Sequence, residues 1–288
     1  MASLQDIRRR IRSVKNTQQV TKAMKMISAV KLRKVQERLL ALRPYASRLQ
    51  EIVRQVVASN RDREVQSPLA LAFLHPREEK RIRLMVMASD KGLCGGFNAN
   101  VLKAAQGFLE ESEAELAQLD VIGKRASEWA RKAGRPTGRD HQGLNIAAFL
   151  ETARSLAQDA VEQYRSGEID ALYVIFNHFN SPVSQVPTVA RIFPMPLDLE
   201  GAPQAAPHLL EPDPETVLEA LLPKAVETEL LHCLLESSAS EQGARMASMD
   251  KATSNAAEMI DKLTLHMNKV RQAAITNQII EIVSGANA

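Results

Sequence analysis

Apolar residues of the N-terminal region recur at steps of three and four, the spacing of a helical seam. The seam passes through Leu4, Ile7, Ile11, Val14, Gln18, Thr21, Lys25, Ser28, Leu32, Val35, Leu39, Leu42, Ala46, Leu49, Val53 and Val56. It turns polar in its middle, where the apolar residues move sideways to Val20, Met24, Ile27 and Val30. No glycine precedes Gly92, so the pattern predicts a helix over residues 4–58, about 80 Å long.

A second run of the same spacing lies near the C-terminus. Its members are Met249, Thr253, Ala256, Ile260, Leu263, Met267, Val270 and Ala274. Helical patterning already begins behind the turn-rich "EPDP", so we expect helix from about residue 213 to 284, broken or bent near Gly243. Isolated helices of this kind are stable only when they bury an apolar face, and we expect the two to form an antiparallel coiled coil.

Between the helices, residues 80–200 alternate strand and helix signals. "RIRLMVMAS", "LDVIG" and "ALYVIF" read as strands, with helices over "ANVLKAAQGFLEESEAEL", residues 124–133 and residues 150–166. "QVPTVARIFP" predicts a further strand. The predicted class is therefore α/β: a small Rossmann-like domain with a mostly parallel sheet, attached to a long antiparallel coiled coil. The expected domains are residues 1–60, 80–200 and 210–288.

Charge is unevenly distributed along the chain, although the formal net charge is only +3. Residues 1–61 hold 15 Lys and Arg against three acidic residues, whereas residues 200–241 hold nine acidic residues against one lysine. Such blocks indicate charged partners or mutual neutralisation. Two distant cysteines predict neither a disulfide framework nor a Cys/His metal cluster, and no apolar run reaches the length of a membrane-spanning helix.

The glycine-rich "DKGLCGGFN" follows a predicted strand and precedes a predicted helix, where α/β folds place phosphate-binding loops. It matches neither the dinucleotide fingerprint nor the P-loop, and we interpret it as a tight structural turn. Cys94 within it is interpreted as a small buried residue, the alternative being a low-pKa thiol at a helix N-terminus.

Other candidate chemistry is sparse. The six histidines show no i, i+4 pair and no acidic companion at metal spacing, so no zinc site, cofactor or catalytic residue is expected. The basic N-terminal helix could be a nucleic-acid arm, but it lacks aromatic stacking residues and its charges alternate with an apolar seam. A cationic rod beside acidic protein loops explains it at least as well.

Three long stretches resemble a known family. "DIRRRIRSVKNTQQVTKAMKMISAVKLRK" with "RPYA", then "SDKGLCGGFN", then "EQGARMASMDKATSNAAEMIDKLTLHMNKVRQAAITNQIIEIVSGA" are similar to the gamma subunits of F-type ATP synthases, of bacterial type. The resemblance implies a central stalk that turns inside a ring of three alpha and three beta subunits. It implies further contacts with the epsilon subunit and the membrane rotor ring, but not with nucleic acid.

The resemblance also implies roles for single residues. It places Met24, Lys25, Arg245, Arg271, Gln272 and Thr276 against the beta subunit, and Pro44, Tyr45, Leu209 and Leu210 at the foot near epsilon and the rotor ring. Gln278 departs from the family pattern, which often has a carboxylate there. The subunit would be non-catalytic and would lie at the cytoplasmic face of the inner membrane, held through its partners. The alternatives are a nucleotide-binding α/β protein and a coiled-coil scaffold or DNA-binding protein.

Overall fold

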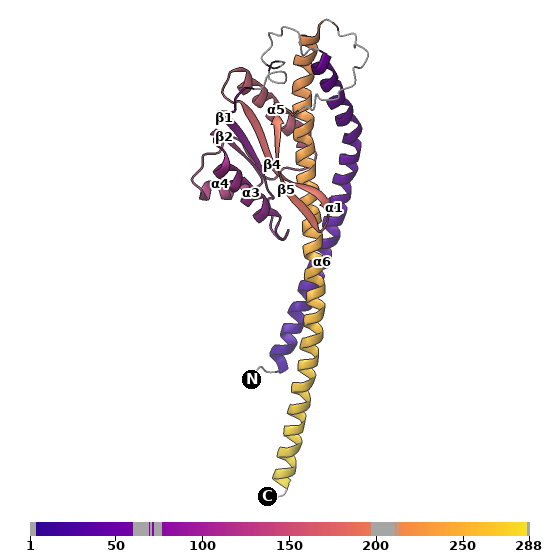
Figure 1. Cartoon of the computed structure of the whole chain (residues 1–288). Helices are drawn as coiled ribbons and strands as arrows, with labels where there is room; N and C mark the ends of the chain where they lie inside the picture. Colours follow the sequence, from indigo (N-terminus) through magenta and orange to yellow (C-terminus); the bar gives the residue numbers. More distant parts are fainter. Residues whose placement is uncertain are drawn as a thin grey trace. The chain divides into compact units, whose positions relative to one another are not determined.

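The computed structural model describes residues 4–59, 69, 71, 77–196, 211 and 213–286 (Figure 1). The helices are α1 (Leu4–Ser59), α3 (Phe97–Glu111), α4 (Lys124–Lys132), α5 (Phe149–Arg165) and α6 (Pro214–Ala286). The strands are β1 (Arg81–Met87), β2 (Glu115–Ile122), β3 (Asp140–His141), β4 (Ala171–Ser181) and β5 (Ser184–Phe193). The α/β class with long terminal helices is thereby confirmed.

The chain divides into two compact units, and each long helix contributes to both. Met1–Val30 and Arg245–Ala288 form one, which we call the helical unit. Lys31–Ala244 forms the other, which we call the α/β unit. The expected three-part division of the chain stays a prediction.

The seam of α1 is buried as its periodicity predicts. In the α/β unit, α1 and α6 lie side by side, and Gln50 donates a hydrogen bond to Glu229 at 3.3 Å (Figure 1). Pro44 lies inside α1 at an exposed position, where water can satisfy the carbonyl that its missing N–H leaves free. The buried residues of these parts of the two helices include Leu32, Val35, Leu39, Leu49, Val53, Leu218, Leu222, Val226 and Leu230.

The start of α6 follows from the "DP" of "EPDP". Asp213 accepts the backbone N–H of Thr216 on Oδ1 at 2.9 Å and the Thr216 hydroxyl on Oδ2 at 2.7 Å. These hydrogen bonds lower the pKa of the Asp213 carboxyl, and the one from the Thr216 backbone contributes most. Pro214 is the first helical residue, where a missing N–H costs nothing. The predicted N-terminus of this helix is therefore confirmed.

The helix was expected to be broken or bent near Gly243. A break is wrong, because α6 is helical from Pro214 to Ala286, and the bend stays a prediction. A side chain at this position would clash instead with the β4–β5 hairpin. A Cβ on Gly243 would lie 2.8 Å from Cε2 of Phe179 and 3.2 Å from Cα of Pro182. The glycine is thus explained by close packing of α6 on the hairpin.

The sheet has five strands in the order β3-β2-β1-β4-β5. β3, β2, β1 and β4 are parallel, and β5 pairs antiparallel with β4. The predicted final strand is therefore confirmed, and it makes the sheet mixed. Only two residues, Pro182 and Val183, separate β4 from β5, and a connection of that length can join only antiparallel strands.

Helices cover both faces of the sheet. α3 and α4 pack on one face, over a core that contains Leu84, Val86, Val101, Ala105, Leu119, Val121, Ala126, Ala130 and Ile175. Side chains alternate along a strand, so Arg83 of β1 points to the opposite face, where it donates a hydrogen bond to Gln163 of α5 at 2.9 Å. Arg83 also forms a fully buried ion pair with Asp120 of β2 at 2.6 Å.

Helix α3 is shorter than the sequence predicted. α3 ends at Glu111, and "EAEL" belongs to the approach and start of β2. The backbone N–H of Glu115 donates to the carbonyl of Lys80 at 2.8 Å, at the edge where β2 begins its pairing with β1. Sheet pairing therefore outweighs the helix propensity of these residues.

Candidate functional site

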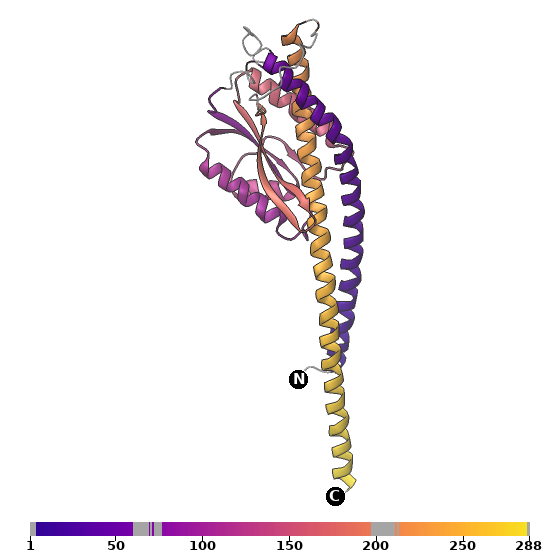
Figure 2. The same cartoon turned by 45° about the vertical axis from the view of Figure 1, so that its right-hand side comes forward.

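The polar gap in the seam lies inside the helix pair of the helical unit. Thr21 and Ser28 are 8% and 2% exposed. The hydroxyl oxygen of Thr21 lies 2.8 Å from that of Thr253, and Lys25 Nζ lies 2.6 Å from Asp250 Oδ1. The two pairings run in opposite directions along α1 and α6, so the helices are antiparallel, as predicted (Figure 2). The seam continues through small hydroxyl side chains instead of apolar ones.

The apolar residues beside the gap face outward. Val20, Ile27 and Val30 are 59%, 56% and 58% exposed, as their sideways shift predicts, and Met26 joins them at 63%. Met24 is half-buried. A run of exposed apolar side chains on one helix marks a surface that a partner can cover.

Each unit carries exposed cations on its part of α1. Lys22 is exposed in the helical unit, and Lys31, Arg33 and Lys34 are exposed in the α/β unit. Two of the cations on α1 are paired within the chain: Lys25 with Asp250 in the helical unit, where the lysine side chain is still 41% exposed, and Arg33 with Glu37 at 3.0 Å in the α/β unit. Part of the charge expected to meet an acidic partner is therefore neutralised within the chain.

The predicted contact residues near the C-terminus lie on the solvent-exposed end of α6. Arg271, Gln272 and Thr276 are exposed, and the Thr276 hydroxyl donates to the carbonyl of Gln272 at 2.9 Å. Within the helical unit α6 continues past the start of α1 (Figure 2). Ile275 and Ile279 are 48% and 55% exposed there. This segment presents apolar and polar groups to its surroundings.

The remaining predicted contact residues differ in exposure. Arg245 is only 8% exposed, so little of its side chain is available to a partner. At the predicted foot, Pro44 is exposed and Tyr45 is 53% exposed on α1. Leu209 and Leu210 lie outside the described residues.

The glycine-rich loop is held by its own side chains. Asp90 accepts the backbone N–H of Lys124 on Oδ1 and that of Gly143 on Oδ2, both at 3.0 Å. Its carboxylate therefore occupies the N-terminus of α4, the helix after β2, whereas the glycine-rich loop itself precedes α3. A phosphate at the N-terminus of α4 would meet this negative charge. Cys94 is 2% exposed, which confirms its interpretation as a small buried residue.

A buried polar joint ties α6 to the sheet within the α/β unit, and the sequence did not reveal it. Glu236 accepts the backbone N–H of Phe179 at 2.8 Å, and the Ser240 hydroxyl donates to the carbonyl of Asn177 at 2.8 Å. The side chain of Asn177 in turn donates to the carbonyl of Phe97 at 3.2 Å. The signal available in the sequence was the pair of polar residues, Glu236 and Ser240, four positions apart in an otherwise apolar helical pattern.

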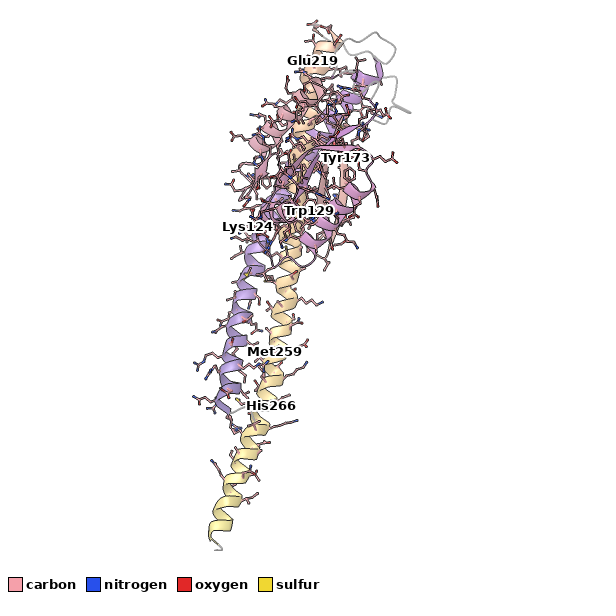
Figure 3. All side chains as sticks on the ribbon, turned by 90° about the vertical axis from the view of Figure 1, so that its left-hand side faces the viewer. Lys124, Trp129, Tyr173, Glu219, Met259 and His266 are labelled. Atoms are coloured by element: carbon pink, nitrogen blue, oxygen red, sulfur yellow. The ribbon has the colours of Figure 1, made fainter. Side chains whose placement is uncertain are left out.

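Outside the seam, the part of α6 in the helical unit is largely solvated. Met259 and His266 project from it (Figure 3). Leu265 is 65% exposed. Among the residues that the structure describes, no helix is long and apolar enough to cross a membrane.

Comparison with known proteins identifies the family. The family model described as ATP synthase matches residues 3–288. The ATP synthase gamma chain of Solibacter usitatus is 49% identical over 290 residues, covering 100% of this chain and 99% of that protein. The chain belongs to the ATP synthase gamma-chain family. The gamma chain of Geobacter metallireducens is 44% identical, with coverage of 100% of this chain and 99% of that protein.

Solved structures share the fold. A chain of the Euglena gracilis mitochondrial ATP synthase matches with a TM-score of 0.65 at 17% identity, covering 99% of this chain and 94% of that chain. A chain of the Tetrahymena thermophila mitochondrial ATP synthase central stalk and c-ring structure matches with a TM-score of 0.58 at 24% identity, covering 81% and 99%. At these identities the likeness concerns the fold.

Gln278, at the position where the resemblance implies a carboxylate, is exposed. An amide carries no charge, so this position cannot form the ion pair that a carboxylate would.

Proposed function

We propose that this chain is the central-stalk rotor of an F-type ATP synthase. It couples proton flow through the membrane rotor ring to ATP synthesis by turning inside a ring of alpha and beta subunits. The observation that carries the proposal is the antiparallel helix pair whose seam is closed by Thr21 and Thr253 and whose outer face carries exposed apolar residues. Contacts along the seam stabilise such a pair, and its exposed outer face remains available to the surrounding ring of alpha and beta subunits.

The mechanism follows from a mismatch of symmetry. A single helix pair is asymmetric, whereas a ring of three catalytic sites has three equivalent positions. Each orientation of the pair therefore presents a different face to each site, and it stabilises a different conformation there. One such face is the outward run of Val20, Ile27 and Val30. Turning the pair changes which site meets this face, so rotation and nucleotide affinity are coupled.

The partner contacts proposed for single residues have uneven support. Exposure favours Arg271, Gln272 and Thr276 as contacts with beta, whereas Met24 and Lys25 are partly covered and Arg245 is largely buried. The exposed Pro44 and Tyr45 are proposed, together with Leu209 and Leu210, to approach epsilon and the rotor ring. The working location would be the cytoplasmic face of a bacterial inner membrane, held through these partners.

The chain itself would be non-catalytic. What supports this is the Asp90 carboxylate at the N-terminus of α4, because a phosphate would meet a negative charge where a nucleotide-binding α/β protein offers free N–H groups. A nucleotide-binding protein should gain thermal stability from its ligand by mass action. A titration of the isolated chain with ATP is expected to give no saturable shift, and a saturable shift would favour the nucleotide-binding alternative.

The test of the rotor proposal is reconstitution. ATP hydrolysis by cognate alpha and beta subunits is measured with and without this chain, all three being shown to be folded. Strong stimulation by the chain is expected, because the asymmetric pair makes the three sites unequal. Unchanged hydrolysis would contradict the proposal.

A further inference from the structure

One face of α6, separate from the proposed beta-contacting residues, gathers three different metal-ligating groups. Glu229, His232 and Cys233 each offer one ligand atom, and these atoms lie within 4.8 Å of one another. The Nδ1 of His232 lies 3.9 Å from Oε1 of Glu229. Steps of three and four from Glu229 place all three side chains on the same side of the helix. The separations are short enough for side-chain adjustment to bring the atoms around one ion.

The groups around this face orient the histidine. The Nε2 of His232 lies 3.6 Å from Oε1 of Glu236, whose side chain is 5% exposed. Glu236 is fixed in turn by the backbone N–H of Phe179, which donates to its Oε2 at 2.8 Å. Histidines that bind metals commonly direct their second ring nitrogen to a carboxylate, which leaves the other nitrogen free to ligate. With the proton on Nε2, on the side of Glu236, Nδ1 keeps a free lone pair on the side of Glu229.

The third ligand group is the thiol of Cys233, which is fully buried beside the two partly exposed ones. Its Sγ lies within 4.8 Å of the ligand atoms of Glu229 and His232.

Glu229 lies at the wall of a cavity. This residue lines a cavity of about 600 Å³ together with Gln50, Arg54 and Arg191, among others. The side chains of Glu229 and His232 are 25% and 30% exposed, so an ion can reach them from solvent. Gln50 also donates to Oε2 of Glu229 at 3.3 Å, which holds the carboxylate in place.

We propose that Glu229, His232 and Cys233 bind a divalent transition-metal ion of the zinc class, with Glu236 as the positioning residue for His232. One oxygen, one nitrogen and one sulfur ligand form a set that suits Zn²⁺, and a water can complete a tetrahedron. The site goes beyond the rotor function. It also corrects the expectation that no histidine has an acidic companion at metal spacing, since Glu229 and Glu236 stand three residues before and four after His232.

The test uses the full chain, reduced and freed of metal, titrated with Co²⁺ and then with Zn²⁺. Binding of one Co²⁺ with a thiolate-to-metal charge-transfer band is expected, and Zn²⁺ should remove the band by displacement. Glu236→Gln should keep the band and weaken affinity by about 10- to 100-fold. Cys233→Ser should abolish the band, whereas Cys94→Ser should retain it.

Two further variants keep the result decisive. His232→Gln alters a partly exposed side chain and carries the test if Cys233→Ser does not fold, as judged by circular dichroism. His266→Gln is the matched control, because this exposed histidine lies on the same helix outside the cluster. Co²⁺ affinity should fall at least tenfold in His232→Gln and stay unchanged in His266→Gln. Absence of the charge-transfer band in the unmodified chain, or equal affinity in all three proteins, would overturn the proposal.

Discussion

The hydroxyl oxygens of Thr21 and Thr253 lie 2.8 Å apart across the antiparallel helix pair. Thr253 can donate to the carbonyl of Met249, and Thr21 can then donate to Thr253. Both hydroxyls are thus satisfied inside a seam that would otherwise require apolar residues. This pairing explains how a polar stretch of α1 holds its partner helix while its apolar neighbours remain available to the surroundings.

Replacing one member of this pair should destabilise the helical unit. Thr21→Val removes the hydrogen bond at nearly constant shape, and we expect a loss of about 1 kcal/mol in the free energy of unfolding. Combining it with Thr253→Val should cost less than the sum of the single losses, because each single variant already loses the same hydrogen bond. Thermal unfolding of the full chain followed by circular dichroism measures this. The matched control is Thr17→Val at an exposed position of α1. Strictly additive losses would contradict the pairing.

Gly243 and Gly107 should respond in opposite ways to alanine. At Gly243 a Cβ would lie 2.8 Å from Cε2 of Phe179, so Gly243→Ala should destabilise the α/β unit by about 1–3 kcal/mol despite the better helix propensity of alanine. At Gly107 in α3 a Cβ would meet nothing within 4 Å, so Gly107→Ala should stabilise by about 0.5–1 kcal/mol. Chemical denaturation of both variants measures the two changes in the free energy of unfolding. Stabilisation by Gly243→Ala would show that the helix does not pack on the hairpin.

The buried ion pair of Arg83 and Asp120 should show strong coupling. Arg83→Met leaves a buried carboxylate without its cation, and we expect a loss of about 3–5 kcal/mol. Arg83→Met combined with Asp120→Leu should lose less than the two single variants together. Recovery stays partial, because Asp120 also accepts hydrogen bonds from Gln118 and from the backbone of Arg139. A double-mutant cycle from denaturant unfolding provides the coupling energy, and a value of zero would be incompatible with the pair.

Much of the fold could be predicted because local rules and the final structure agree. The steps of three and four in both long helices, the "DP" start of α6 and the strand signals of the middle all act over a few residues. The burial of Ile7, Leu32 and Met249 follows directly from this periodicity. Where local propensity and long-range pairing disagree, as at "EAEL" before β2, the prediction failed, because the partner strand could not be identified from the sequence.

The candidate site was predicted less completely, because it too depends on contacts between residues that are far apart in the sequence. The outward shift of Val20 and Ile27 is visible in the sequence, but the ion pair that neutralises part of Lys25 depends on Asp250, which lies 225 residues away. The cluster around His232 was not predicted, because the histidines were expected to lack acidic companions at metal spacing. Its acidic neighbours stand on the same helix at steps of three and four, and that spacing was the usable signal.

Coupling between rotation and catalysis should depend on the exposed end of α6. Arg271→Ala combined with Gln272→Ala removes two exposed polar groups that are proposed to contact beta. Proton-driven ATP synthesis in membrane vesicles should fall, whereas nucleotide binding to beta should remain. Lys269→Ala, at another exposed position on the same helix, serves as the control. Undiminished synthesis in the double variant would exclude these residues from the mechanism.

The most direct test of the rotor account is to watch the chain turn. Cys94 and Cys233 are 2% and 0% exposed, so a cysteine introduced as Val183→Cys, at a position 86% exposed, gives a selective attachment point for a visible probe. Complexes of the labelled chain with cognate alpha and beta subunits are fixed to a surface through beta and supplied with ATP. The account predicts stepwise rotation of the probe in one direction, with three pauses in each turn. ATP hydrolysis by complexes whose probe stays still would contradict it.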